Sequence, residues 1–182
     1  MKKMDWKDLY THRLYITLDG NRLARAASQP ASDDDTTIAW TPGRFLAVGR
    51  GGIVFTGRPG KEIGGGIVLR SPDFASITIT AMDGKDLALS KRILVSACGR
   101  CENTDMVFSK NRRSVGKNWG LSPVQIEPVT ADVSLPPDDW RCQALGPDCL
   151  PSADVSVAKK GNFSLLQLSP QYKTMWYLLT RK

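Results

Sequence analysis

Short runs in which apolar and polar residues alternate, separated by turn residues, make up most of the sequence. Residues 12–18 alternate in this way and precede Asp19-Gly20, a dipeptide typical of tight hairpin turns. We therefore expect a first hairpin whose return strand runs from Leu23 to Ala27. Ser76–Thr80 alternates equally regularly, which predicts a strand with one buried and one solvated face.

The same pattern predicts further strands along the rest of the chain. Arg92–Cys98 is almost continuously apolar, which is typical of a strand in the centre of a sheet. The other expected strands are Thr37–Trp40, Arg44–Val48, Ile53–Thr56, Ile67–Arg70, Ser76–Ala81, Asp105–Phe108, Val124–Glu127, Thr130–Leu135, Gln143–Leu145, Asp154–Val157, Phe163–Leu168 and Thr174–Thr180. No long stretch has helical periodicity.

The 16 glycines and 11 prolines favour an all-β fold, because they interrupt the chain at intervals too short for long helices. About a dozen short strands at this spacing indicate a two-sheet sandwich, Greek-key or jelly-roll-like. We interpret residues 1–10 as an N-terminal arm or linker and residues 11–182 as a single β-sandwich domain.

The formal net charge of +7 makes a polyanion a candidate partner. Most basic residues are dispersed, but one local concentration consists of Lys110, Arg112, Arg113 and Lys117. Nucleic acid is not the favoured polyanion, because no recognition-helix pattern or aromatic RNA-binding motif accompanies the charge. No window approaches the roughly 20 apolar residues of a membrane-spanning helix, and the basic N-terminus lacks the apolar stretch of a signal peptide.

Few residues are available for catalysis. The single histidine, His12, has no nucleophile motif beside it. Glycoside hydrolysis commonly uses a pair of carboxylates, for which Glu102 and Glu127 are the candidates. The glycine runs at 49–52 and 64–66 lack the Gly-Lys-Ser/Thr ending of a phosphate-binding loop and are interpreted as turns. The sequence therefore leans towards a non-catalytic role, with a small hydrolase or lyase using Glu102 or Glu127 as the alternative.

The tryptophans are candidates for sugar binding, because an exposed indole offers an apolar face to the C–H face of a sugar ring. Trp119 and Trp140 follow polar residues and are the expected exposed platforms, whereas Trp176 lies among apolar residues and is expected in the core. We take Trp119, Trp140, Asn118 and Arg113 as the candidate ligand-binding residues.

The four cysteines form two close pairs. Cys142 and Cys149 flank a Gly-Pro turn and are candidates for a disulfide-closed loop, whereas Cys98 and Cys101 are interpreted as half-buried structural thiols. A zinc site is not favoured, because the spacing of the second pair is too long. No cofactor is expected apart from structural calcium, for which Asp33–Asp35 or Asp138-Asp139 are candidate ligands.

Three stretches resemble the C-terminal β-domain of large bacterial glycoside-hydrolase-like proteins. The first is Met82–Ala97 continuing through Gly99-Arg100 and Glu102–Met106, similar to a DGKPL-S-RILLTAxGRxENTGM segment. The second is Trp119-Gly120 with Pro123–Val129, and the third is Leu166–Pro170 with Thr174–Tyr177. Cys98, Cys101 and Asp105 depart from the pattern, Asp105 in place of a glycine.

The resemblance implies a carbohydrate-binding or structural accessory module of a polysaccharide-degrading glycoside hydrolase. Its partners would be a polysaccharide or oligosaccharide and the catalytic domain of the same parent chain. The parent would be extracellular or periplasmic, although this chain carries no signal peptide. The residues themselves assign fold-making roles to the motif: Asp83-Gly84 as a hairpin turn, and Asn103-Thr104 as polar groups that satisfy the backbone at a strand end.

Overall fold

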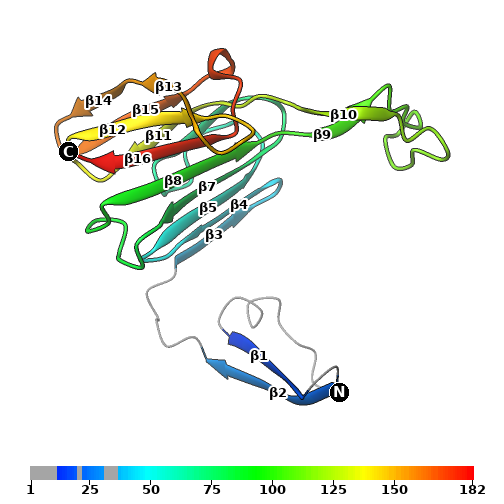
Figure 1. Ribbon diagram of the computed structural model, residues 1–182, viewed down its shortest axis with the longest axis horizontal. Coiled ribbons are helices and arrows are strands. Elements are labelled where there is room, and N and C mark those ends of the chain that lie inside the picture. Colours follow the sequence, from blue (N-terminus) through cyan, green and yellow to red (C-terminus); the bar gives the residue numbers. More distant parts are fainter. Residues whose placement is uncertain (1–11, 20–21, 31–36) are drawn as a thin grey trace. The chain divides into compact units, whose positions relative to one another are not determined.

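The computed structural model describes residues 12–19, 22–30 and 37–182, and the chain divides into two compact units between Thr36 and Thr37. In the first unit, β1 (His12–Asp19) pairs with β2 (Arg22–Pro30) as the expected antiparallel hairpin (Figure 1). The predicted arm, residues 1–10, lies outside the described residues. A single domain was expected from residue 11 to residue 182, and the second compact unit covers Thr37–Lys182.

The body, residues 37–182, consists of short strands and one short 3-10 helix. The strands are β3 (Thr37–Thr41), β4 (Arg44–Val48), β5 (Gly52–Gly57), β6 (Ile67–Ser71), β7 (Ala75–Ala81), β8 (Arg92–Cys98), β9 (Cys101–Thr104), β10 (Leu121–Ile126), β11 (Thr130–Leu135), β12 (Trp140–Leu145), β13 (Pro151–Val155), β14 (Val157–Lys160), β15 (Phe163–Leu168) and β16 (Trp176–Arg181), with η1 (Pro170–Tyr172) before the last strand. Among the described residues, no helix is long and apolar enough to cross a membrane.

The strands of the body form two larger antiparallel sheets and one separate two-stranded ribbon. The large sheet has eight strands in the order β13-β12-β16-β8-β7-β5-β4-β3, and the small sheet has four in the order β14-β15-β11-β6. β8 lies between β16 and β7, in the interior position that its apolar run predicts. β9 and β10 pair only with each other.

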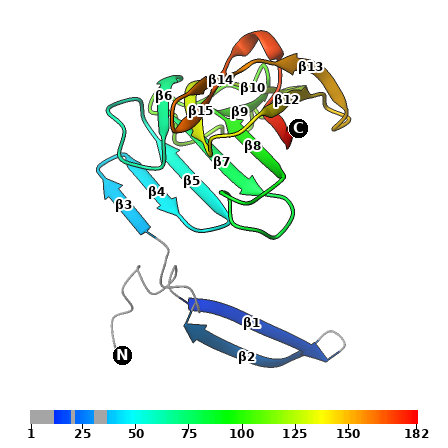
Figure 2. The same cartoon turned by 90° about the vertical axis from the view of Figure 1, so that its left-hand side faces the viewer.

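One core joins the two larger sheets, and it follows from the alternation of apolar residues along the strands. Ile77, Val95 and Tyr177 point inward from the large sheet, and Val133 and Leu166 point inward from the small one. All five side chains are fully buried in one cluster. The all-β, two-layer prediction is therefore confirmed, as Figure 2 shows. The Greek-key or jelly-roll-like connectivity stays a prediction.

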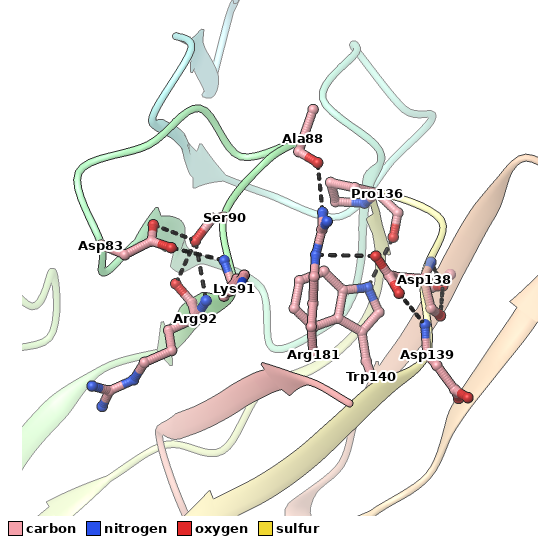
Figure 3. A network of polar contacts seen from close by, with 11 residues as sticks. Asp83, Ala88, Ser90, Lys91, Arg92, Pro136, Asp138, Asp139, Trp140 and Arg181 are labelled. Carbon is pink, nitrogen blue, oxygen red and sulfur yellow. Dashed lines mark hydrogen bonds and ion pairs between the residues drawn. The ribbon is translucent and has the colours of Figure 1, made fainter.

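The connection between β7 and β8 contains the expected Asp83-Gly84 turn, with Gly84 at φ +70°. The two oxygens of Asp83 accept hydrogen bonds from the Lys91 N–H and the Ser90 hydroxyl, each at 2.8 Å (Figure 3). These bonds, the one from Lys91 first, lower the pKa of Asp83 because they favour the charged form. The Asp83 carboxylate therefore holds together the two ends of the connection between β7 and β8.

Two strand predictions in the body are wrong in detail. The strand predicted over Asp105–Phe108 does not form, because the chain turns at Asp105, and the strand lies just before it in β9. One strand was predicted over Asp154–Val157, where the structure has β13 and β14 with a break at Ser156.

Candidate functional site

The two-stranded ribbon projects from one end of the sandwich (Figure 1). We call β9, β10 and the loop between them, residues 101–126, the arm. Cys101 pairs with Ile126 and Asn103 pairs with Val124, so Val124 and Ile126 share one face of the ribbon with these two residues. Gln125 pairs with Glu102 on the opposite face.

Side-chain hydrogen bonds hold the root of the arm together. The Asn103 amide donates to the Trp119 carbonyl at 2.8 Å, and the Thr104 hydroxyl donates to the Pro123 carbonyl at 2.8 Å. Gly120 has φ +69°, and a Cβ atom there would lie 2.2 Å from the Thr104 carbonyl oxygen. These contacts confirm the predicted backbone-satisfying role of Asn103 and Thr104, and they require glycine at position 120.

Asp105 is the residue that departs from the glycine of the resembled segment. Its φ is +59°, in the left-handed region that glycine adopts readily and that aspartate tolerates better than most residues. The turn that ends β9 therefore explains why either residue type suits this position.

Three of the four candidate ligand-binding residues lie on the loop of the arm. The Trp119 side chain is 62% exposed, and Asn118 and Arg113 are exposed as well. The Asn118 carbonyl accepts a hydrogen bond from the Val107 N–H at 3.1 Å, which fixes the backbone beside Trp119. The structure thus presents an exposed indole on an ordered loop.

The basic residues of the same loop have different surroundings. Arg112 forms an ion pair with Glu102, and its guanidinium carbon lies 4.1 Å from the centre of the Phe108 ring. Lys110, Arg113 and Lys117 are exposed, and no ion pair engages them within the described part of the chain. Arg112 therefore supports the loop, and the other three cations face solvent.

The prediction that Trp140 is an exposed platform is wrong, because its side chain is only 6% exposed. β12 turns residues 140, 142 and 144 inward, and the Trp140 indole N–H donates to the Pro136 carbonyl at 2.9 Å (Figure 3). The guanidinium of Arg181 covers the ring at 5.1 Å from its centre and forms an ion pair with Asp138 at 3.1 Å. Trp140 is part of the core.

The two candidate catalytic glutamates are engaged by different partners. The Glu102 carboxylate pairs with Arg112 on the arm, whereas a Glu127 carboxylate oxygen accepts a hydrogen bond from the Arg100 N–H at 3.1 Å. A glycosidase needs both carboxyl groups beside one sugar bond. Among the described residues, no hydrogen bond or ion pair joins these two side chains, so the structure gives no support to their acting as a pair.

A cleft of about 480 Å³ lies where the arm joins the sandwich, and it is half open to solvent. Val124 and Ile126 line it from the arm, and Met175 and Trp176 line it from the start of β16 and the residue before it. The lining is mostly apolar, with Glu127, Lys173 and Thr174 as its polar side chains. Among the described lining residues, Glu127 is the only carboxylate.

Residues from three stretches that are distant in the sequence meet at this cleft. The first contributes Ala97, the second contributes residues 124 and 126–128, and the third contributes Pro170 and residues 174–176. Sequence reasoning did not find the cleft, because its lining residues are up to 79 positions apart along the chain, from Ala97 to Trp176.

Trp176 was expected in the core, but it is only half-buried and lines the cleft. The backbone N–H of Trp176 donates a hydrogen bond to the Thr174 hydroxyl oxygen at 2.9 Å. That hydroxyl in turn donates to the Leu145 carbonyl at 2.6 Å. The inward residues of β16 are instead Tyr177 and Leu179, one register step away.

All four cysteines are free thiols in the structure. Cys142 is buried in β12, whereas Cys149 is exposed on the loop after it, so the candidate disulfide between them is not formed. Cys98 is half-buried as expected, but Cys101 is exposed. Burial, and then the nearby Cys101, raise the pKa of Cys98.

Within the described residues, no three His, Cys, Asp or Glu side chains gather closely enough to hold a metal ion. Asp138 is paired with Arg181, and Asp139 lies 3.5 Å from the Lys159 ammonium. The other candidate calcium ligands, Asp33–Asp35, lie outside the described residues, as does the side chain of His12.

No protein-family model, no curated protein and no solved structure matches this chain.

Proposed function

We propose that this chain is a non-catalytic accessory module of a polysaccharide-degrading glycoside hydrolase, and that it contacts glycan through the arm. The observation that carries the proposal is the exposed Trp119 indole on a loop fixed by hydrogen bonds at its root. The resemblance of residues 82–106 supports the assignment to a bacterial parent enzyme. The same resemblance implies a parent in the extracellular space or periplasm, and the proposal includes this location.

The chemistry of the loop suits a sugar chain. A sugar ring has an apolar C–H face and a polar rim, so an indole can stack on the face while neighbouring donors reach the hydroxyls. Asn118 and Arg113 supply such donors on the same loop as Trp119. The ordered backbone reduces the conformational entropy lost on binding.

The experiment is affinity electrophoresis of the full chain through a panel of neutral and acidic polysaccharides. We expect retardation by at least one of them, with a dissociation constant between millimolar and micromolar, and loss of most retardation in Trp119→Ala. Phe74→Ala is the matched control, because Phe74 is an exposed aromatic on the body outside the arm. No retardation by any polysaccharide, or equal retardation of both variants, would refute glycan binding by the arm.

The enzymatic alternative can be tested with the same purified chain and polysaccharides. If the purified chain releases reducing ends from a polysaccharide, and Glu127→Gln or Glu102→Gln abolishes this activity, the non-catalytic proposal is wrong. We expect no release, because Glu127 is the only carboxylate among the described cleft residues and Glu102 is paired with Arg112.

The three solvent-facing cations add electrostatic attraction for any acidic polysaccharide that the loop of the arm contacts. We expect binding to polygalacturonate to weaken steeply as salt rises, because cations on the loop release counterions from a polyanion. Replacing Arg113 and Lys117 by alanine should reduce the salt dependence. Replacing Lys159 and Lys160 on β14 is the control for general charge. Equal binding to single-stranded DNA would instead favour the polyanion-binding alternative.

A structural role in the same parent enzyme is favoured by one further observation. Leu121 is 72% exposed and Val107 is 57% exposed. The arm therefore presents aliphatic side chains to solvent, and sugar hydroxyls form no favourable contact with them. An accessory module that packs on a catalytic domain would bury them. We expect Leu121→Ser to lower the melting temperature of the parent's catalytic domain in differential scanning calorimetry. Unchanged melting would argue against the structural role.

A further inference from the structure

We infer that the cleft at the root of the arm binds one sugar ring of a neutral glycan, with the Trp176 indole as its stacking surface. This inference rests on the proposed function and adds a second contact site to it, separate from the loop that carries Trp119. The cleft lies between the arm and the sandwich, so residues from both parts contribute to it.

The size and apolar lining of the cleft fit a small ligand. Its volume of about 480 Å³ lies within the range of small-molecule sites, which are mostly apolar with a few placed polar groups. Trp176, Met175 and Pro170 line the cleft from the sandwich, and Val124 and Ile126 line it from the arm. A pyranose ring bound in the cleft would bury apolar C–H surface against these side chains.

The polar side chains at the cleft suit hydroxyl groups. Glu127 offers carboxylate oxygens as acceptors, and the Lys173 ammonium offers donors. Glu127 is held by the Arg100 N–H, and the Lys173 backbone is held in the left-handed region by a bond from its N–H to the Pro170 carbonyl at 3.0 Å. One negative and one positive side chain sum to zero, which favours a neutral sugar over an acidic one.

The walls are held in place before any ligand arrives. Thr174 anchors the start of β16 through its bonds to Trp176 and Leu145, and the Thr104–Pro123 bond fixes the strand that carries Val124. A preorganised cleft avoids the entropic cost of ordering side chains on binding. An apolar side chain of a partner protein would also fit the walls, but it would leave Glu127 and Lys173 without new partners.

The test follows the indole N–H signals of the full chain, labelled with ¹⁵N-tryptophan, as cellohexaose, xylohexaose and mannohexaose are added. The Trp176 signal is assigned by its absence in Trp176→Phe, and the Trp119 signal by its absence in Trp119→Phe. We expect at least one of the three neutral sugars to shift the Trp176 signal. We also expect at least about tenfold weaker binding in Trp176→Ala, as for the truncation of a central aromatic anchor.

A second variant keeps the test valid if Trp176→Ala fails to fold. Val124→Gln changes the lining that the arm contributes, at a residue that is largely exposed. It should weaken binding of the same sugar to the cleft several-fold, whereas Trp119→Ala should leave that binding unchanged. A shift of the Trp119 signal alone would overturn the cleft site and leave the proposed function standing. Failure of all three sugars to shift Trp176, together with no retardation in the polysaccharide panel, would overturn both.

Discussion

Trp119 and Trp140 have opposite environments, although both follow polar residues in the sequence. Trp140→Ala removes a buried indole with its hydrogen bond and its contact with Arg181, so we expect a loss of about 3–5 kcal/mol in the free energy of unfolding. Trp119→Ala should change it by less than about 0.5 kcal/mol, because the indole is exposed. Urea unfolding followed by circular dichroism measures both, and equal losses would contradict the assigned burial.

The thiol of Cys142 should be unreactive in the folded chain. Burial, and to a lesser degree the charge of Asp154, raise its pKa from 9.0 to about 12, and only the thiolate is nucleophilic. We expect iodoacetamide at pH 8 to modify the exposed Cys101 and Cys149 but to leave Cys142 intact until the protein is denatured. Peptide mapping by mass spectrometry measures this, and a Cys142–Cys149 cross-linked peptide would contradict it.

The same shift gives the sign of a pH effect. The folded pKa of Cys142 lies above the unfolded value, so the unfolded chain loses this proton first as pH rises. The contribution of Cys142 to stability is therefore complete below pH 9 and is lost progressively between pH 9 and pH 12. Cys142→Ala should remove this alkaline dependence.

Single residues also show where sequence reasoning failed. Asp138 and Asp139 made Trp140 look exposed, but a side chain's direction in a strand depends on its register against the core, and β12 turns position 140 inward. The apolar neighbours of Trp176 led to the opposite error, because they predicted a core position for a side chain that is only half-buried. Tyr177 and Leu179 take the inward positions of β16, which leaves Trp176 on the other face.

At the scale of the element, the arm should depend on Gly120. Alanine at Gly116 or Gly120 meets a left-handed backbone, but only at Gly120 does the new Cβ collide with backbone, 2.2 Å from the Thr104 oxygen. At Gly116 nothing lies within 4 Å. We expect Gly120→Ala to increase amide hydrogen exchange across β9 and β10, and Gly116→Ala to have little effect. Mass spectrometry reads both, with β7 and β8 as the internal reference.

The arm itself was predicted only in part. Val124–Glu127 was expected as a strand, but a strand was also expected at Asp105–Phe108 and none at Cys101–Thr104, because Cys101–Thr104 has no alternation of apolar and polar residues. The hydrogen bond between Asn103 and Trp119 joins residues sixteen positions apart and helps to define the ribbon. No local sequence pattern predicts such a contact. The turns at Asp83-Gly84 were predictable because a local dipeptide determines them.

At the scale of the whole molecule, the all-β sandwich was predictable and the cleft was not. Alternation records which face of a strand is buried, and the structure shows the matching alternation of buried and less buried side chains in β7, β8, β11, β15 and β16. The cleft depends on how the arm, the β12–β13 loop and the start of β16 meet at one end of the sandwich. That arrangement follows from the pairing of strands distant in sequence, which single-sequence periodicity does not encode.

The body should fold without the first unit. The chain divides into two compact units at Thr37, and the side chains of residues 37–182 form a core cluster that includes residues of both larger sheets. We therefore expect a fragment of residues 37–182 to unfold cooperatively, with a melting temperature within about 4 °C of the full chain, the shift that corresponds to roughly 1 kcal/mol in a domain of this size. Thermal circular dichroism measures the transition, and the Trp176 indole signal with and without sugar reports whether the cleft is intact. A fragment that lacks a cooperative transition would show that residues 1–36 contribute to the core, and the boundary at Thr37 would then be wrong.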